Sequence, residues 1–220
     1  MTFGQVQEQA LYAANGARKY LNQSERRRAL SAMSELPADQ ALFALTLAWT
    51  GARISEVLAL TGASFQIDAG VVAIRTLKRR RHVMREVPLP PTLVAALDRH
   101  FALSAMRRDP PLKAELADHR LWPWHRATAW RYVKKVMRRA GIVGRGACPR
   151  GLRHAFGVGT LQSGVPLNLV QRWLGHARIS TTAIYADVNG PEEMAFAAQY
   201  WHVNDNRSSD TVGRPRPRHA

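Results

Sequence analysis

Thr50-Gly-Ala-Arg-Ile-Ser-Glu-Val-Leu-Ala-Leu60 is the stretch in which a long apolar segment is followed by a short helix with both apolar and charged residues. The apolar segment, residues 41–49, is about half as long as a membrane span, so it predicts a buried core helix that ends at the glycine. Residues 53–60 predict a second, short helix with its aliphatic side chains facing inward. Arg53 and Glu56 are three residues apart, which places these two charges together on another face of that helix.

The segments on both sides of this stretch predict mostly helices and one small sheet. The expected helices span residues 22–35, 40–50, 92–106, 125–141, 150–163, 166–174, 180–187 and 192–201. Asn22 or Ser24 can cap the first helix, and Asp39 can cap the second. The β-rich runs at 71–77 and 83–89 predict an antiparallel hairpin. The expected fold class is therefore mainly α with a small antiparallel β-sheet (α+β).

The chain is strongly basic, with 32 Lys and Arg residues against 16 Asp and Glu and a formal net charge of +16. Because 46% of its residues are hydrophobic, it is too apolar for a disordered basic tail, and the charge belongs to a folded body. Such a body needs a polyanionic partner, of which nucleic acid is the leading candidate. The single cysteine, Cys148, excludes an internal disulfide, and no Cys/His cluster indicates a zinc site.

Two clusters hold much of the positive charge. One surrounds the hairpin tip and consists of Arg75, Lys78, Arg79, Arg80, Arg81 and Arg85. The other lies on the helix over residues 126–139 and consists of Arg131, Lys134, Lys135, Arg138 and Arg139. The packing stripe expected on that helix consists of Trp130, Val133, Met137 and Ala140. A solvated loop and a solvated helix face would also account for these clusters, but in so basic a chain we favour contacts with DNA phosphates.

Two later motifs complete the pattern: Gly151-Leu-Arg-His-Ala-Phe156 and Leu174-Gly-His-Ala-Arg-Ile-Ser-Thr-Thr-Ala-Ile-Tyr185. With the first stretch, they make the sequence resemble the tyrosine recombinase (phage integrase) family over roughly residues 20–202. A lone arginine or tyrosine is usually structural, whereas five matches in order, each on the expected type of element, form a strong signal. The resemblance implies the catalytic-domain fold of this family, which is the DNA breaking-rejoining type.

The resemblance also implies a role for each matched residue. Arg53 matches the first catalytic arginine, Glu56 its acidic companion, and Arg153 the second arginine. Elementary chemistry agrees, because two guanidinium groups can stabilise the extra negative charge of an attacked phosphodiester. The resemblance implies no metal ion, ATP or other cofactor.

Three more residues match positions that the family uses as general acid, hydrogen-bond donor and nucleophile. Lys78, in the hairpin, matches the catalytic lysine and would protonate the departing 5′-oxygen. His176 matches the histidine of the third box and would supply another hydrogen-bond donor. Tyr185, nine residues later, matches the nucleophile and would form a covalent 3′-phosphotyrosine bond that conserves the energy of the broken strand.

One position departs from the family pattern. The family usually has His, or sometimes Lys, three residues before the second arginine, where this chain has Arg150. An arginine cannot act as a general base, so we expect slower activation of Tyr185 rather than its loss. Arg150 could instead bind phosphate or Glu56. His154, one helical turn further along, either packs structurally or takes over the proton transfer.

The expected domain organisation is compact. A helical N-terminal extension is expected over residues 1–20, the catalytic domain over 21–202 and a disordered basic tail over 203–220. This would be a short form without the N-terminal core-binding domain that integrases commonly carry, similar in layout to fimbrial phase-variation recombinases. The N-terminus shows no secretion leader, so we expect a cytoplasmic protein that is associated with the bacterial nucleoid when bound to DNA.

The resemblance implies a site-specific DNA recombinase (integrase) that acts on double-stranded recombination sites as a homodimer or homotetramer, with accessory DNA-binding proteins and without a membrane. The alternative is a catalytically weak DNA-binding relative that occupies or bends such sites. Two features favour this alternative: Arg150, and the expected absence of the N-terminal core-binding domain. A basic RNA- or ribosome-associated protein would explain the charge, but it leaves the ordered Arg, Lys, Arg, His and Tyr series to chance.

Overall fold

A computed structural model describes residues 11–77, 83–109, 114–117 and 119–186, together with Ala198 and Trp201. The chain divides into two units, residues 1–185 and residues 186–220, and the elements below belong to the first. The basic tail and most of the helix expected over 192–201 lie outside the described residues.

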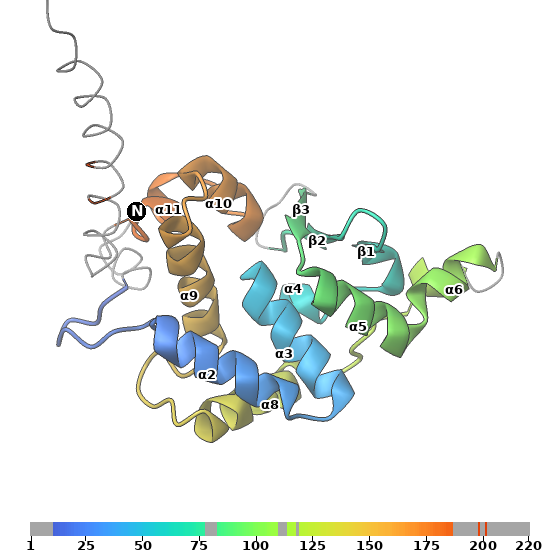
Figure 1. The fold of residues 1–220 in the computed structure, drawn as a ribbon, viewed down its shortest axis with the longest axis horizontal. Helices are drawn as coiled ribbons and strands as arrows, with labels where there is room; N and C mark the ends of the chain where they lie inside the picture. The colour runs from blue at the N-terminus through green and yellow to red at the C-terminus, as the bar shows by residue number, and fades with distance from the viewer. Residues whose placement is uncertain are drawn as a thin grey trace, which may run out of the picture. The chain divides into compact units, whose positions relative to one another are not determined.

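The core is built around α3 (Ala38–Thr50), the helix that the apolar segment predicts. Figure 1 shows α3 in the middle of the unit, where four of the longer helices contact it. These are α2 (Gln23–Ser34), α5 (Pro91–Phe101), α8 (Arg126–Arg139) and α9 (Pro149–Gln162). Side chains all around α3 are buried, including the consecutive residues Leu42, Phe43 and Ala44, as expected of a helix that is apolar on every side.

A side chain caps the first of these helices but not the second. Asn22 caps α2, because its side chain accepts the backbone N–H of Glu25 at 2.8 Å while the Glu25 carboxylate accepts the N–H of Asn22 at 2.8 Å. This reciprocal pair is a capping box. Asp39 does not cap α3, contrary to expectation, because the helix already begins after Pro37 and Asp39 lies in its first turn.

The segment before α2 differs from the expected helical extension. Its described part, residues 11–20, forms a turn that an antiparallel bridge between Tyr12 and Arg18 closes. Residues 1–10 lie outside the described part of the chain. The helical prediction is therefore wrong for the second half of this segment.

The expected antiparallel sheet is present, with three strands in the order β1-β2-β3. The strands are β1 (Phe65–Gln66), which follows the 3-10 turn η1 (Gly62–Ser64), β2 (Val71–Arg75) and β3 (Met84–Pro88). Val72 and Ile74 on β2 pair with Val87 and Arg85 on β3, and all four are buried. Arg85 therefore lies on the inner face of the sheet, and its assignment to the DNA-facing hairpin cluster is wrong.

The helix expected over residues 92–106 is interrupted. It consists of α5 and α6 (Leu103–Arg108), which separate at Ala102. The φ of Ala102 is 51°, in the left-handed region that residues other than glycine seldom adopt. No glycine or proline marks this break in the sequence, so composition gave no sign of it.

The basic helix α8 packs through a stripe shifted from the expected one. Its buried residues are Ala129, Val133, Val136 and Met137. Trp130, which was expected in the stripe, is 46% exposed, with the ammonium of Lys134 5.7 Å from the centre of its ring. The prediction for Trp130 is wrong because the buried stripe is centred on the side of Ala129, Val133 and Val136, and Trp130 lies at the edge of that stripe.

Three short helices bring the motifs to the end of α3. They are α4 (Ile54–Val57), α10 (Leu167–Leu174) and α11 (Ser180–Ala183). Helix α4 contacts α3, α10 contacts α9 and β3, and α11 contacts α10. Both α4 and α11 are shorter than the helices expected over 53–60 and 180–187. The three sequence motifs therefore meet in one part of the fold.

Candidate active site

The first motif begins where α3 ends. Gly51 closes the helix at a φ of +59°, and a Cβ at this position would lie 2.5 Å from the ring of Phe156. Arg53 follows as the N-cap of α4, and the carboxylate of Glu56 accepts its backbone N–H at 3.0 Å and its Nη1 at 2.9 Å. The side chain of Arg53 keeps 29% of its surface exposed, so an anion from solvent can reach it.

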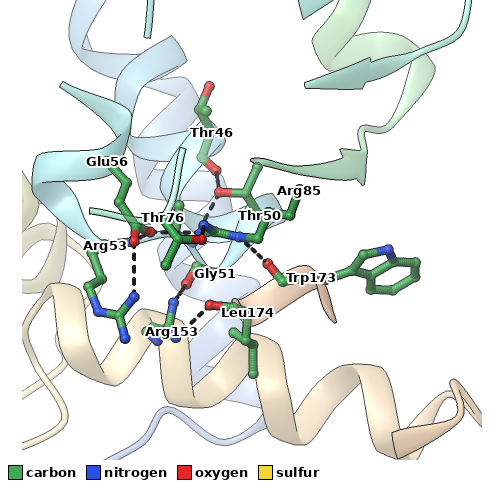
Figure 2. Close-up of polar contacts among 11 residues, drawn as sticks. Thr46, Thr50, Gly51, Arg53, Glu56, Thr76, Arg85, Arg153, Trp173 and Leu174 are labelled. Carbon is green, nitrogen blue, oxygen red and sulfur yellow. Dashed lines mark hydrogen bonds and ion pairs between the residues drawn. The ribbon is translucent and has the colours of Figure 1, made fainter. Parts of the chain in front are cut away.

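Glu56 is a buried charge held between two arginines (Figure 2). Nη2 of Arg85 donates to one carboxylate oxygen at 2.7 Å, and Nη1 of Arg53 donates to the other. Burial alone would raise the pKa of the Glu56 carboxyl, but the charges of Arg85 and Arg53 and the hydrogen bonds hold that pKa below its usual value. Glu56 is therefore ionised at neutral pH and fixes the direction of Arg53.

Arg85 uses all three guanidinium nitrogens in this network (Figure 2). Nε donates to the carbonyl oxygen of Trp173 at 2.7 Å, Nη1 to the hydroxyl of Thr76 at 2.8 Å, and Nη2 to Glu56. One side chain thus joins β3 to β2, α4 and the last turn of α10. The sequence carried a signal for this role, since Arg85 and the apolar Val87 share one face of a strand.

Arg153, from the second motif, is held by two backbone carbonyl groups. Its Nη1 donates to Gly51 O at 2.7 Å and its Nη2 to Leu174 O at 2.8 Å, so it ties the end of α3 to the end of α10 (Figure 2). Burial and the nearby charge of Arg53 lower the pKa of Arg153 to about 9. An anion placed between the two arginines would relieve their repulsion.

His176 follows the glycine that ends α10. Its Nδ1 lies 2.9 Å from the hydroxyl of Thr182, a contact that fixes the orientation of the ring. Burial and then the charges of Arg153 and Arg53 lower the pKa of His176 to about 3, so the ring is neutral at pH 7.

Tyr185 ends the third motif and is only 3% exposed. Its ring lies against Gly157 of α9, where a Cβ would come within 2.6 Å of a ring carbon, and it is nearly parallel to the ring of His176, at 17° and 6.2 Å between centres. Nδ1 of His154 lies 3.2 Å from its hydroxyl. Burial raises the pKa of Tyr185, and the charges of Arg153 and Arg53 offset part of that rise.

A comparison with known protein families agrees with this geometry, because residues 19–191 match the phage integrase family. The chain belongs to the phage integrase family. The tyrosine recombinase XerA of Pyrococcus furiosus is 28% identical to it over 170 residues, covering 77% of this chain and 57% of the relative. The tyrosine recombinase XerD of Neisseria meningitidis is 32% identical over 152 residues, covering 68% and 50%. This integrase-family chain thus spans about half the length of the curated relatives it matches.

Solved structures show the same fold. The crystal structure of XerA recombinase has a TM-score of 0.65 at 24% identity, covering 90% of this chain and 66% of that one. XerH bound to its difH substrate before cleavage has a TM-score of 0.64 at 22% identity, covering 90% and 61%. The catalytic domain of bacteriophage HP1 integrase has a TM-score of 0.55 at 21% identity, covering 76% and 86%. The helix-rich fold with a small sheet is therefore that of tyrosine recombinase catalytic domains.

In this integrase-family protein the structure brings together most of the site residues that the sequence predicts. These are Arg53, Glu56, Arg153, His176 and Tyr185. Lys78 lies outside the described residues, as do Arg79, Arg80 and Arg81. Arg150 is exposed on the first turn of α9, while His154, one turn further along, is buried.

The expected DNA-contact residues that the structure describes differ in their exposure. Arg75 on β2 and Arg131, Arg138 and Arg139 on α8 are exposed, whereas Lys134 and Lys135 are half-buried. Nζ of Lys134 donates to the carbonyl oxygen of Ala147 at 2.9 Å, which fixes it against the loop before α9. Within the described ranges, no group of three or more His, Cys, Asp or Glu side chains could hold a metal ion. No helix in the same part of the chain is long and apolar enough to cross a membrane.

Gly175 of the family's Leu-Gly-His motif gives a first prediction. Gly175→Ala places a side chain at a φ of +68°, with its Cβ 2.9 Å from the Thr76 hydroxyl oxygen and 3.0 Å from Nη1 of Arg85. We expect a loss of about 1–2 kcal/mol of unfolding free energy for the backbone and about 1–3 kcal/mol more for the crowding. Denaturant unfolding measures it. Gly164→Ala, at a φ of +79° with no atom within 4 Å of its Cβ, should show the backbone part alone, and equal losses would contradict the crowding.

Proposed function

We propose that this chain is a site-specific DNA recombinase in which Tyr185 is the nucleophile that cleaves and rejoins a DNA strand. One observation carries the proposal. A part-exposed arginine at the N-cap of α4 and an arginine on α9 that is anchored to backbone carbonyls lie beside a buried tyrosine and a neutral histidine. A phosphodiester between Arg53 and Arg153 would have its developing negative charge stabilised from two directions.

The reaction is a transesterification. The oxygen of Tyr185 attacks phosphorus, a 3′-phosphotyrosyl bond forms, and the bond from phosphorus to the 5′-oxygen breaks. Lys78, by resemblance to the family, protonates that oxygen, and His176 donates a hydrogen bond to the phosphate. Glu56 keeps Arg53 aimed at the phosphate while Arg85 keeps Glu56 in place. Rejoining is the reverse of these steps, so no external energy source is required.

The remaining positive charge holds the duplex. Exposed cations on β2 and α8 would contact phosphates of double-stranded recombination sites, together with the hairpin cations, for which the clustered charge favours DNA contact. XerH, whose structure was determined on its difH substrate, supports DNA as the partner. We propose that the protein acts in the cytoplasm on the nucleoid, as a homodimer or homotetramer on paired sites.

A second candidate function is DNA binding without efficient cleavage. Two observations favour it: Arg150 stands where the family usually has a histidine, and burial raises the pKa of Tyr185 and so disfavours its reactive phenolate. Such a protein would occupy or bend recombination sites for another recombinase.

Trapping the covalent intermediate tests the proposal. DNA sites selected from a random pool are nicked near the cleavage position, so that the short leaving strand diffuses away, and the complexes are denatured in detergent. We expect a covalent protein–DNA adduct with the wild-type chain and none with Tyr185→Phe. Tyr132→Phe, at a half-buried tyrosine packed on Trp124, is the matched control and should keep the adduct. Binding to a selected site without any wild-type adduct would favour the second candidate.

A further inference from the structure

The hydroxyl of Tyr185 has a histidine within reach of its proton. Nδ1 of His154 lies 3.2 Å from Oη of Tyr185, at the long end of the range over which a general base acts. Both side chains are buried, with 6% and 3% of their surfaces exposed. His154 directly follows Arg153 on α9, so the helix that supplies the second arginine also supplies this contact.

The protonation state of His154 suits an acceptor. Burial, followed by the charges of Arg153, Arg150 and Lys19, lowers the pKa of His154 to about 4, so the ring is neutral at pH 7. A neutral imidazole has one nitrogen that accepts and one that donates. Because the phenol carries a proton to donate and Nδ1 faces it, we assign the acceptor to Nδ1 and the ring proton to Nε2.

The other ring nitrogen argues against a purely structural histidine. Nε2 of His154 is buried and has no hydrogen-bond partner among the described residues. A buried polar atom without a partner destabilises the fold, because it gives up its hydrogen bonds to water without replacing them. Such exceptions are uncommon in native proteins, and a catalytic role is one of the explanations for them.

The usual base position of the family is occupied by a group that cannot accept a proton. Arg150 lies one helical turn before His154 and is exposed, and a guanidinium stays protonated at any physiological pH. His154 is therefore the group on α9 that can take the proton where Arg150 cannot.

We infer that His154 is the catalytic residue that accepts the phenolic proton of Tyr185 during attack on the phosphate, an inference that rests on the proposed function. The proton moves from Oη to Nδ1 as the bond from Oη to phosphorus forms, and the bond from phosphorus to the 5′-oxygen breaks. The 5′-oxygen takes its proton from the general acid assigned to Lys78. In the rejoining step the imidazolium of His154 returns the proton to Tyr185, so the cycle is balanced.

The charges around His154 couple this transfer to DNA. An imidazolium beside Arg153, Arg150 and Lys19 is unfavourable in the free protein, as the lowered pKa of His154 indicates. A phosphate bound between Arg53 and Arg153 adds negative charge next to the ring and offsets that repulsion. His154 is therefore a weak base in the free protein and a stronger one once the scissile phosphate is in place.

The test uses the full chain and the nicked site under single-turnover conditions with saturating DNA. His154→Asn keeps an amide oxygen that can accept a hydrogen bond from Tyr185 but cannot take up a proton. We expect its cleavage rate to fall by about 100-fold, the lower end of the usual range for general-base catalysis. Its DNA affinity should stay within about twofold. His119→Asn, at an exposed histidine outside the site, is the control and should cleave like the wild type.

Two further measurements separate proton transfer from positioning. Without its base, the variant depends on solvent to ionise Tyr185, so its rate should rise with pH more steeply than that of the wild type. The titratable and charged groups around His154 are Tyr185, Arg153, Arg150, Lys19 and His176. Arg150→His should restore part of the rate in the His154→Asn background, whereas Arg150→Ala should not.

Specific outcomes would overturn the inference. A His154→Asn rate within about threefold of the wild type would exclude His154 as the base. So would parallel pH profiles for the variant and the wild type. If the wild-type chain forms no adduct on its selected site, the proposed function itself is contradicted. The two failures are therefore distinguishable.

Discussion

Arg85→Met should lower the free energy of unfolding by about 3–5 kcal/mol, the range for removing one partner of a buried ion pair. The reason lies with the residue left behind. Glu56 is fully buried, and without Arg85 one of its oxygens would keep only the backbone N–H of Arg53. The Trp173 carbonyl and the Thr76 hydroxyl would lose their Arg85 donors at the same time.

Denaturant unfolding of the free protein measures this loss. Arg138→Met is the matched control, because it removes the same type of side chain from an exposed position on α8, and it should change stability by about 0.5 kcal/mol or less. Adding Glu56→Gln to Arg85→Met should recover part of the loss, since a neutral amide no longer needs a buried countercharge. Equal losses at Arg138 and Arg85 would contradict the buried network.

Gly157→Ala should reduce the rate of adduct formation by about 100-fold, the effect of misplacing a reacting group by about 1 Å. Its Cβ would lie 2.6, 2.7 and 2.8 Å from three carbons of the Tyr185 ring. Because both the ring and α9 are buried on this side, the ring has to move away from its present position. We expect a stability loss of about 1–3 kcal/mol from the same crowding.

Single-turnover cleavage at saturating DNA separates the rate from DNA binding, which should stay unchanged. Gly159→Ala is the matched control on the same helix, since no atom lies within 4 Å of its Cβ. Alanine there should leave cleavage unchanged and stabilise the helix by about 0.5–1 kcal/mol. A Gly157→Ala rate equal to or above that of the wild type would show that the buried position of Tyr185 is not the reacting one.

The sequence was sufficient wherever spacing within one element carried the information. The apolar run predicted α3, and the three-residue spacing of Arg53 and Glu56 predicted a pair that the structure joins at 2.9 Å. The capping pattern at Asn22 predicted the start of α2. In each case the contact forms between residues four or fewer positions apart, so local geometry determines it.

The errors arose where a contact between distant segments overrides the local pattern. Arg85 belongs by charge to the hairpin cluster, but its partners lie 29 and 88 residues away along the chain. The contact between Gly157 and Tyr185 likewise joins α9 to the turn after α11, and no periodicity relates these two segments. His154 and Tyr185 are 31 residues apart along the chain, so the sequence could not predict their contact. It left open whether His154 packs structurally or takes part in proton transfer.

The two carbonyl groups that hold Arg153 have a consequence for how far the sequence of this protein can diverge. Every residue has the same backbone carbonyl oxygen, whatever its side chain. A substitution at Leu174 therefore leaves the acceptor of the hydrogen bond from Arg153 in place. At Gly51 the positive φ and the nearby Phe156 ring restrict which side chain is tolerated. The hydrogen bond from Arg153 to the Gly51 carbonyl oxygen sets no such restriction. The two hydrogen bonds of Arg153 are therefore kept in any related sequence that preserves the ends of α3 and α10. They depend on the backbone at these two positions and not on the identity of the side chains there.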